Sequence, residues 1–316
     1  MLKSLIKKIL IIIGLRKESV LLHYKIKEVY MKTFFSTISK REKYIKKEYK
    51  KVFNKEINFN EEPRTFNEKI QFRKLYDNNP LYSICADKYK VREYVTKKLG
   101  GGVEYLIPLY LVTDKLTEEQ WKKLPNQFVV KANHNSGPVQ IIKNKNKVNK
   151  KEIIKELDYQ LKLDYGILSM EKYYSNIPRK IIVEKFIETK GPLNDYKFHC
   201  FKNKLGKRNI FIEHILDSND LGNLTSCFYD TNWNRLNFSV HGQEYKEKLE
   251  KPKNLEKMVK IAEKLSEDFG YVRVDLYNIN GKIYFGELTF CNWSGYGRFS
   301  KQEWDYKFGE YWYQEC

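Results

Sequence analysis

Two kinds of hydrophobic pattern run along the chain. Within residues 252–269 apolar residues recur at helical spacing, and Gly270 follows them. These residues are Leu255, Met258, Val259, Ala262, Leu265 and Phe269. The spacing predicts an amphipathic helix that ends at the glycine. The segments that follow, 271–277 and 282–290, alternate apolar with polar residues around a short "NING" turn, which predicts a β-hairpin.

Strand-like segments dominate from about residue 103 onward. Further strands are predicted at 104–112, 127–132, 139–143, 179–187, 195–201 and 209–216, the last two joined as a hairpin by "KNKLGK". Helices are predicted within 18–80, at 88–99 and at 152–165. The "TFNE" stretch from Thr65 is a capping-box pattern, and Asp87 is the expected cap of the helix 88–99. Because most strands pair as hairpins, the fold class is predicted as α+β rather than a doubly wound parallel sheet.

Positive charge is concentrated at the start of the chain. The net charge is +19, and residues 1–50 contribute +10 of it through 14 Lys and Arg against 4 Glu. A basic excess in one segment favours an anionic partner, such as a membrane surface or an acidic polymer. The sequence holds no RNA- or DNA-binding motif, so we predict no nucleic-acid partner.

Residues 1–17 combine basic residues with an apolar run from Ile9 to Leu15. The run is too short to span a bilayer, which needs about 20 residues, and no small-residue cleavage site follows it. Two interpretations stay open: a basic amphipathic helix on the inner membrane surface, or a helix packed on the body of the protein. The five cysteines include no CxxC pair, which is typical of reduced thiols. We expect a cytoplasmic protein, with residues 1–17 as a candidate peripheral contact with the inner face of the membrane.

The hairpin 271–290 carries the most informative charges. Along its first strand the apolar residues face one way, Arg273 and Asp275 face the other, and the turn returns Glu287 to the same neighbourhood. Such charges on one polar face are costly unless something binds between them. Two carboxylates suit Mg²⁺, and the arginine suits a phosphate or a developing oxyanion. A surface ion-pair cluster is the alternative explanation.

The turn of this hairpin decides whether the charges meet. A two-residue turn at Asn280-Gly281 pairs Asp275 with Gly286, which leaves Glu287 on the opposite face. A three-residue loop at 279–281 pairs Arg273 with Glu287 and returns both carboxylates to one face. The chemistry therefore selects the three-residue loop, or a β-bulge of equal effect.

Lysines accompany three other elements. Lys131 ends an apolar strand directly before the polar loop 133–137, whose backbone N–H groups suit a phosphate. Lys88 precedes a helix, and Asp195 and Lys197 alternate with aromatic residues along a strand. Together with the acidic hairpin, these lysines predict a nucleoside-triphosphate site. It is not a P-loop, because GxxxxGK[ST] is absent.

From about residue 60 to the C-terminus, the order of segments resembles the ATP-grasp superfamily. Within it, the chain is similar to the TupA-like branch associated with teichuronopeptide and surface-polysaccharide biosynthesis. The segments are "FNEKIQFRKLYDNNPLY", "DKYKVREYV", "VVKANHNSG", "IIVEKFI", "DYKFHCF", "FYDTNW" and "FGYVRVDLYNINGKIYFGELTF". The resemblance implies an ATP-grasp domain at 81–316, with two α+β subdomains that hold ATP between antiparallel sheets. A helical, basic region at 1–80 precedes it.

The resemblance also implies roles for individual residues, with ATP and Mg²⁺ as cofactors. The implied ATP contacts are Lys88, Lys131, the phosphate loop Asn133, His134, Ser136 and Gly137, the adenine hinge Glu184, Lys185, Phe186 and Ile187, and the polar residues Asp195 and Lys197. Arg273 would act with Lys131 on the transferring phosphoryl group. The implied metal ligands are Asp275, Glu287 and Thr289. Thr289 stands where many members have an asparagine, and Asn292 lies close by in sequence. Ser294 and Arg298 are candidates for substrate contacts in the following loop.

ATP-grasp enzymes mostly convert a carboxylate to an acyl phosphate and let an amine displace the phosphate. The resemblance thus implies a carboxylate–amine ligase whose partners are a uronic acid in a surface glycan or sugar nucleotide and an amino acid or small amine. Two alternatives stay open. One is a kinase of a glycan hydroxyl, and the other is a non-catalytic ATP-binding scaffold in polysaccharide assembly.

Overall fold

The computed structural model describes residues 16–189, 195–216, 225–244 and 249–314, with side chains placed for most of them. The interpretations of residues 1–15 as a membrane-surface or packed helix lie outside this part of the chain. In the part that is described, every helix falls short of the length or the hydrophobicity that a bilayer crossing requires.

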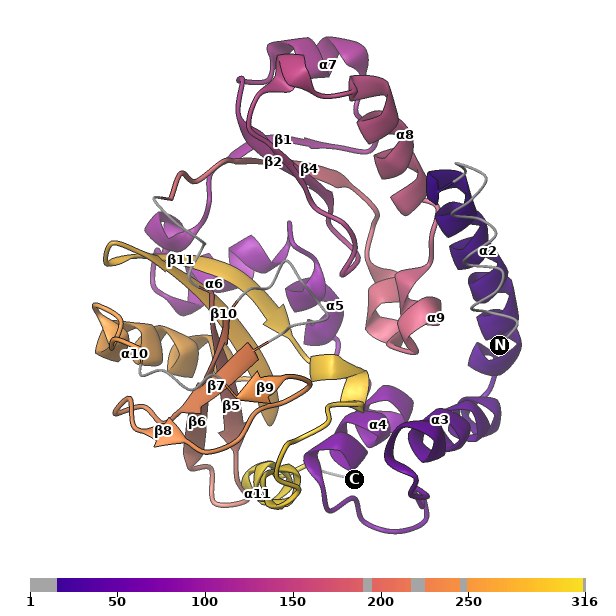
Figure 1. The fold of residues 1–316 in the computed structure, drawn as a ribbon, viewed down its shortest axis with the longest axis vertical. Coiled ribbons are helices and arrows are strands. Elements are labelled where there is room, and N and C mark those ends of the chain that lie inside the picture. Colours follow the sequence, from indigo (N-terminus) through magenta and orange to yellow (C-terminus); the bar gives the residue numbers. More distant parts are fainter. Residues whose placement is uncertain (1–15, 190–194, 217–224, 245–248, 315–316) are drawn as a thin grey trace.

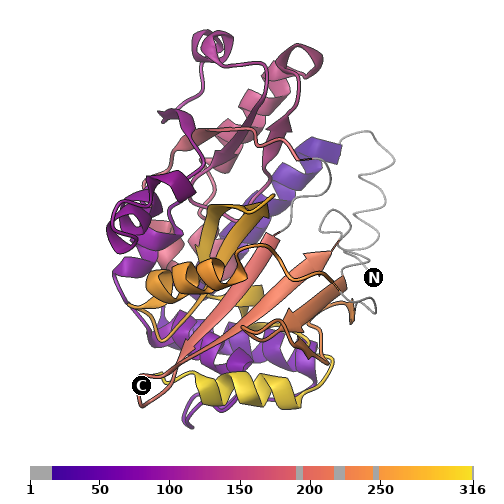
Figure 2. The same cartoon turned by 90° about the vertical axis from the view of Figure 1, so that its left-hand side faces the viewer.

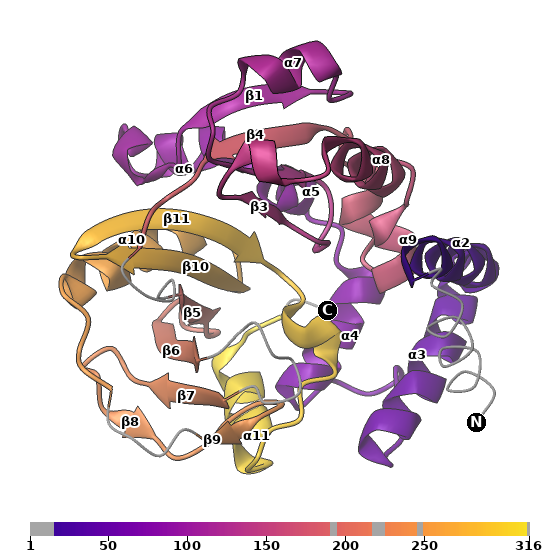
Figure 3. The same cartoon turned by 45° about the horizontal axis from the view of Figure 1, so that its top comes forward.

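Two antiparallel sheets form the framework, and this confirms the predicted α+β class. The smaller sheet has the order β1 (Leu109–Thr113), β4 (Ile181–Lys185), β2 (Phe128–Ala132) and β3 (Gln140–Ile142). The larger sheet has the order β11 (Lys282–Thr289), β10 (Tyr271–Ile279), β5 (Asp195–Lys202), β6 (Arg208–Leu216), β7 (Thr225–Tyr229) and β8 (Arg235–Leu236), and β9 (Gln243–Glu244) pairs with β7. Figure 3 shows the smaller sheet lying over β10 and β11.

The N-terminal region is helical, as predicted. It contains α2 (Arg16–Phe35), α3 (Ile38–Phe53) and α4 (Phe66–Tyr76), and α5 (Leu81–Ala86) and α6 (Val91–Lys98) follow it within the predicted domain 81–316. The predicted capping box is present at the start of α4, where Thr65 and Glu68 exchange side-chain and backbone hydrogen bonds. The prediction that Asp87 caps the next helix is wrong in detail. Asp87 follows α5, and its carboxylate accepts hydrogen bonds from the Tyr89 N–H and the Asn133 amide, because α6 begins later than expected.

Short elements connect the strands. They are the 3₁₀ turns η1 (Val103–Tyr105), η2 (Lys145–Lys147), η3 (Lys172–Asn176) and η4 (Asn292–Gly295), and the helices α7 (Glu118–Lys123), α8 (Lys150–Gln160), α9 (Tyr165–Ser169), α10 (Leu255–Ser266) and α11 (Glu303–Tyr311). The single helix predicted at 152–165 is two, because Asp164 starts α9 by accepting a hydrogen bond from the Ile167 N–H.

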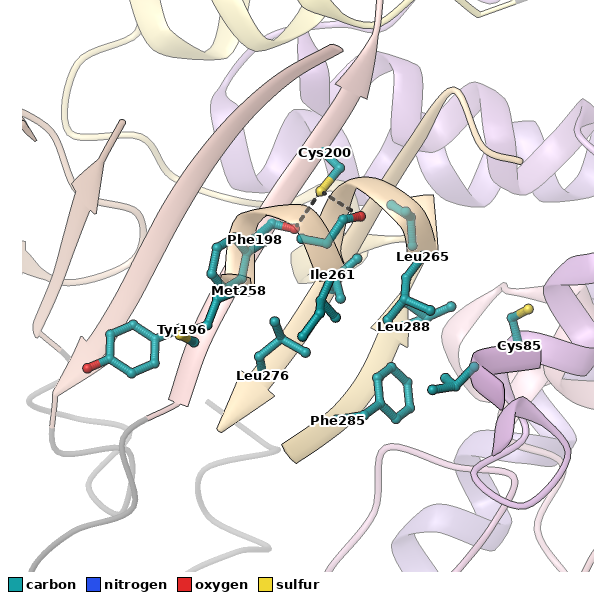
Figure 4. Packing of buried hydrophobic residues seen from close by; sticks show 14 of the residues in the cluster. Cys85, Tyr196, Phe198, Cys200, Met258, Ile261, Leu265, Leu276, Phe285 and Leu288 are labelled. Carbon is teal, nitrogen blue, oxygen red and sulfur yellow. Dashed lines mark hydrogen bonds between the residues drawn. The ribbon is translucent and has the colours of Figure 1, made fainter. Parts of the chain in front are cut away.

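The main core lies between α10 and one face of the larger sheet (Figures 2 and 4). The predicted apolar stripe of α10 packs there against the inward residues of β5, β10 and β11, among them Phe198, Leu276 and Leu288. Cys85, Cys200, Cys227 and Cys291 are buried thiols. With one face of β10 and β11 filled mainly by apolar contacts, Arg273, Asp275 and Glu287 lie on the other face, toward the smaller sheet.

Candidate active site

The β10–β11 hairpin has a two-residue turn and a bulge. Asn280 and Gly281 both have positive φ, 53° and 90°, and Ile279 pairs with Lys282 across the turn. The pairing then shifts, so that Leu276 opposes Phe285 while Asp275 opposes Glu287, and Gly286 is the extra residue. The three-residue loop is therefore wrong, and the alternative of a bulge is correct.

Glycine at position 286 suits the crowded backbone of this bulge. A Cβ added there would lie 3.1 Å from the backbone oxygen of Asp275, which is tighter than ordinary van der Waals contact. By adding one residue to β11, Gly286 reverses the alternation and returns Glu287 to the face of Asp275. The two carboxylates lie directly opposite each other as a consequence.

Arg273 ties this polar face together. Its guanidinium donates to both oxygens of Asp275, at 2.7 and 2.6 Å, and to Glu287 Oε1 at 3.0 Å. It also donates to Asn292 Oδ1 at 2.5 Å, which brings the first residue of η4 into the cluster. The Thr289 hydroxyl donates to Glu287 Oε1 at 3.2 Å. The structure thus brings all three residues predicted as metal ligands next to the predicted catalytic arginine, together with Asn292.

A second cation reaches the same carboxylate from β5. Lys197 Nζ lies 2.8 Å from Asp275 Oδ2 and 2.5 Å from Asp195 Oδ2. Burial alone would raise the pKa of Asp275, but Arg273 and Lys197 outweigh it and lower that pKa to about 2. Asp275 is therefore ionised, buried and paired with two cations.

Of the two predicted phosphate lysines, Lys131 is on β2 of the smaller sheet and Lys88 lies between α5 and α6. Lys131 Nζ pairs with Glu184 Oε2 at 2.6 Å, and the Lys88 ammonium donates to the carbonyl of Asn135. Burial lowers the pKa of Lys88, and Glu287, Lys131 and Glu184 are its main electrostatic neighbours. Glu287 belongs to the larger sheet, and Lys131 and Glu184 belong to the smaller one. Charged groups from both sheets therefore surround the Lys88 ammonium.

The predicted phosphate loop is anchored from below. The Asn133 side chain donates to Asp87 Oδ1 at 2.8 Å and to the Pro178 carbonyl at 3.0 Å, and His134 Nε2 contacts the Leu163 carbonyl at 3.2 Å. Both side chains are buried, so they position the loop instead of extending into the space between the sheets. Within the described residues no acceptor is bonded to the backbone N–H groups of residues 134–136. Such N–H groups suit an anionic ligand.

His134 gives the fold a pH dependence that can be measured. Burial lowers its pKa to about 4, whereas in an unfolded chain its pKa is about 6.5. A depressed folded-state pKa means that stability is complete above pH 6.5 and is lost as the pH falls toward 4. We expect the wild type to lose about 2 kcal/mol more than His134→Gln between pH 7 and pH 5. Urea unfolding at both pH values measures this, and equal losses in the two proteins would contradict it.

The predicted hinge begins in β4 and leaves it. The backbone of Glu184 is paired in the sheet, and the Lys185 N–H donates to the Pro108 carbonyl. Phe186 and Ile187 lie beyond the end of the strand, which stops two residues earlier than predicted. Of the predicted hinge, only Phe186 and Ile187 have backbone N–H and C=O groups that are not used in strand pairing.

The two candidate substrate residues have different positions. The Ser294 hydroxyl accepts a hydrogen bond from Lys74 Nζ at 2.6 Å, and it lines a cavity beside the phosphate loop. Arg298 is exposed, and its guanidinium donates to the Val52 carbonyl at 3.3 Å. The structure therefore does not bring Arg298 to the site.

Several residues near the site were not anticipated from the sequence. Tyr277 lies two positions after Asp275 on β10, and burial raises its pKa, with Asp195, Glu287, Asp275 and Glu184 around it. Lys74 and Glu171 are buried charged residues close to Ser294. Alternation along β10 could have identified Tyr277, but nothing in the sequence links α4 to residue 294.

Two subdomains with facing antiparallel sheets, lysines on one and an Arg–Asp–Glu cluster on the other, define an ATP-grasp type of nucleotide-binding protein. The family model described as TupA-like ATPgrasp matches residues 68–313. The chain therefore belongs to the TupA-like ATP-grasp family, whose superfamily generally consists of ATP-dependent carboxylate–amine ligases. No curated protein matches the chain.

Solved structures with a similar arrangement are distant in sequence. D-alanine–D-alanine ligase from Bacillus anthracis is 20% identical, with a TM-score of 0.36 over 65% of this chain and 57% of that one. N5-carboxyaminoimidazole ribonucleotide synthetase from Thermus thermophilus is 13% identical, with a TM-score of 0.39 over 72% and 52%. Biotin carboxylase from Campylobacter jejuni is 13% identical, with a TM-score of 0.38 over 74% and 48%. The chain thus spans about half the length of these enzymes.

The donor set fits the cofactors that the family typically binds, ATP and Mg²⁺. Asp195 Oδ1 is buried and has no hydrogen-bond partner among the described residues, so it is an acceptor that a hydroxyl group of a nucleotide would satisfy. The described residues contain no group of three or more His, Cys, Asp and Glu side chains suited to a metal. Mg²⁺, however, usually takes one or two carboxylates together with phosphate oxygens, and Asp275 and Glu287 provide such a pair.

Proposed function

We propose that the chain is an ADP-forming carboxylate–amine ligase that activates a uronic acid of a surface polysaccharide or its precursor. The observation that carries the proposal is the single polar face of β10 and β11, where the bulge at Gly286 sets Glu287 opposite Asp275 with Arg273 between them. Asp275 and Glu287 would hold Mg²⁺, which supplies charge neutralisation at the phosphates. Lys88, Lys131 and the amides of residues 134–136 would bind the phosphates.

The residues of this chain act by positioning and by electrostatics. Arg273 stabilises negative charge on the phosphoryl group as it passes from ATP to a carboxylate oxygen of the acceptor and ADP departs. The amine then attacks the acyl carbon, the phosphate leaves, and the amine loses a proton as the amide bond forms. The rigid strands keep these groups aligned, which lowers the entropic part of the barrier.

Trapping with hydroxylamine tests the proposal. We expect ATP, Mg²⁺ and the correct uronic acid to give a hydroxamate, detected as its coloured iron(III) complex, because hydroxylamine intercepts an activated carboxylate. A panel of uronic acids, each paired with amines in an ADP-release assay, identifies the substrate. ADP release that produces a phosphorylated sugar and no hydroxamate would show a kinase of a glycan hydroxyl. Binding of ATP without turnover of any acceptor would show a scaffold.

Membrane contact through residues 1–17 is a second part of the proposal, and it rests on charge. This segment has five Lys and Arg residues, and each basic residue near an anionic surface contributes about 1 kcal/mol of binding. We expect deletion of residues 1–17 to abolish co-sedimentation with phosphatidylserine-containing vesicles and to leave catalysis intact. An unfolded truncated protein would instead favour a helix packed on the body of the protein.

A further inference from the structure

A cavity of about 870 Å³ lies beside the phosphate loop, between the N-terminal helices and the rest of the protein. Its walls come from α2, α3, α4, α8, α9, the loop between β2 and β3, and η4. Figure 1 shows α2 running alongside α8 and α9, which closes this side of the molecule. The volume is within the range of about 300–1,000 Å³ that small-molecule sites occupy.

The position of the cavity connects it to the proposed reaction centre. Asn135, Ser136 and Gly137 of the phosphate loop form part of one wall. Ser294 and Tyr296 of η4 and its end form part of another wall, and the Asn292 side chain of the same turn is bonded to Arg273 at 2.5 Å. A molecule in the cavity therefore lies next to both the loop and the strand ends that surround the phosphates.

The inner end of the cavity holds a buried ammonium group, that of Lys74 on α4. The residue is 5% exposed, and its Nζ donates to the carbonyl and hydroxyl oxygens of Ser294, both at 2.6 Å. Among the described residues no carboxylate lies within 4.0 Å of this ammonium, so its charge has no direct ion-pair partner. Burial lowers the pKa of Lys74, and the more distant Glu171 opposes that effect. The Ser294 hydroxyl in turn donates to Glu171 Oε1 at 3.3 Å, so Glu171 compensates Lys74 only indirectly, and a ligand with an anionic group would pair with the ammonium directly.

The backbone that presents Ser294 to Lys74 is strained. Trp293 and Ser294 both have left-handed backbone angles, φ 50° and 54°, which non-glycine residues rarely adopt. Gln71 of α4 also donates to the Ser294 and Gly295 carbonyls, at 3.1 and 2.8 Å. Strain that is maintained by several buried hydrogen bonds is typical of functional sites.

The remaining walls combine tyrosines with the charged residues Lys27, Glu152, Lys155 and Glu156. Tyr24, Tyr44, Tyr159, Tyr165 and Tyr296 line the cavity. A tyrosine offers a flat apolar ring together with a polar hydroxyl, which suits a sugar because a sugar presents both C–H faces and hydroxyl groups.

We propose that this cavity is the acceptor site, in which Lys74 binds the carboxylate of a sugar acid and the tyrosines of α2, α3 and α8 contact its ring. The inference rests on the proposed ligase function and deepens it by assigning the acceptor to a place. It also gives the N-terminal helices a role in substrate selection.

Equilibrium binding to the full-length chain tests this inference. The probes are glucuronate, galacturonate and mannuronate, each compared with its neutral parent sugar, in the presence of Mg²⁺ and the non-hydrolysable analogue AMP-PNP. We expect at least one uronate to bind, and its neutral parent to bind at least about tenfold more weakly, because Lys74 contributes a charge-assisted hydrogen bond. Lys74→Met should weaken uronate binding by about tenfold or more and leave AMP-PNP binding unchanged.

Two further variants keep the test decisive. Lys122→Met makes the same chemical change at an exposed lysine of α7 and should leave uronate binding unchanged. Tyr159→Ala changes the cavity wall and leaves the hydrogen bonds of Lys74 in place. It should also weaken uronate binding. The inference can therefore be tested even if Lys74→Met does not fold. The inference is overturned if the wild type binds AMP-PNP but no uronate. It is also overturned if Tyr159→Ala and Lys74→Met both bind the uronate as tightly as the wild type does. A wild-type protein that does not bind AMP-PNP would instead contradict the proposed function itself.

Discussion

Glu287→Gln is expected to abolish ADP release and to leave the protein folded. The glutamate side chain is 40% exposed and has hydrogen bonds only from Arg273 and the Thr289 hydroxyl among the described residues. Glutamine preserves its shape and costs about 1 kcal/mol or less of stability, because a partly exposed ion pair contributes little. It removes, however, one of the two carboxylates that Mg²⁺ would use. ADP release with the substrate found in the acceptor screen measures the effect.

A matched variant shows whether the loss is specific. Glu119→Gln makes the same change on α7, where the carboxylate is 79% exposed and pairs with an exposed lysine. This variant should retain full activity. Near-normal ADP release by Glu287→Gln would contradict the assignment of Glu287 as a metal ligand. If the variant were unfolded at the assay temperature, its lost activity would show a structural role for Glu287.

Asp275→Asn is expected to destabilise the protein as well as inactivate it. The two carboxylates on the polar face differ in burial, so we expect their removal to affect stability differently. Asp275 has a side chain that is only 3% exposed, and it neutralises Arg273 and Lys197, whose side chains are 11% and 12% exposed. Removal of one partner from a buried ion pair costs about 3–5 kcal/mol, because the remaining charges lose their compensation. Urea unfolding at pH 7 measures the change in the free energy of unfolding.

A second substitution isolates the electrostatic cause. In the double variant Asp275→Asn with Lys197→Met, one of the two uncompensated cations is gone, so part of the lost stability should return. The double-mutant cycle gives the coupling energy between the two residues. Additive losses would show that Asp275 stabilises the fold through packing or hydrogen bonding rather than through its charge.

The hairpin shows how far local sequence information reaches. Alternation in β10, the stripe of α10 and the Asn280-Gly281 turn are all local signals, and each gave the correct element. The turn alone would have placed Glu287 on the wrong face. The bulge is indicated only by the chemical requirement that the two carboxylates meet. The one sequence feature at its position is the glycine at 286.

The site residues that sequence reasoning missed depend on distant contacts. Lys74 meets Ser294 across 220 residues of chain, so no periodicity or spacing links them. Distant contacts also hold Asn133 and His134, for which the family resemblance implies a place in the phosphate loop. Their side chains are bonded to Asp87, Pro178 and Leu163, which are 29 to 46 residues away in the sequence.

The packing of α4 also sets the order in which the protein is built. Arg73 donates to the Tyr271 and Phe290 carbonyls, and Asn67 donates to Asp305, which lies 238 residues further along the chain. At translation rates of about 5–20 residues per second, α4 leaves the ribosome roughly 10–50 s before the last of these partners is made. Until then, the Arg73 and Asn67 side chains of this helix lack these hydrogen-bond partners. The contacts of α4 with β10 and α11 therefore form only after residue 305 has been added, well after the strands of the smaller sheet have been synthesised.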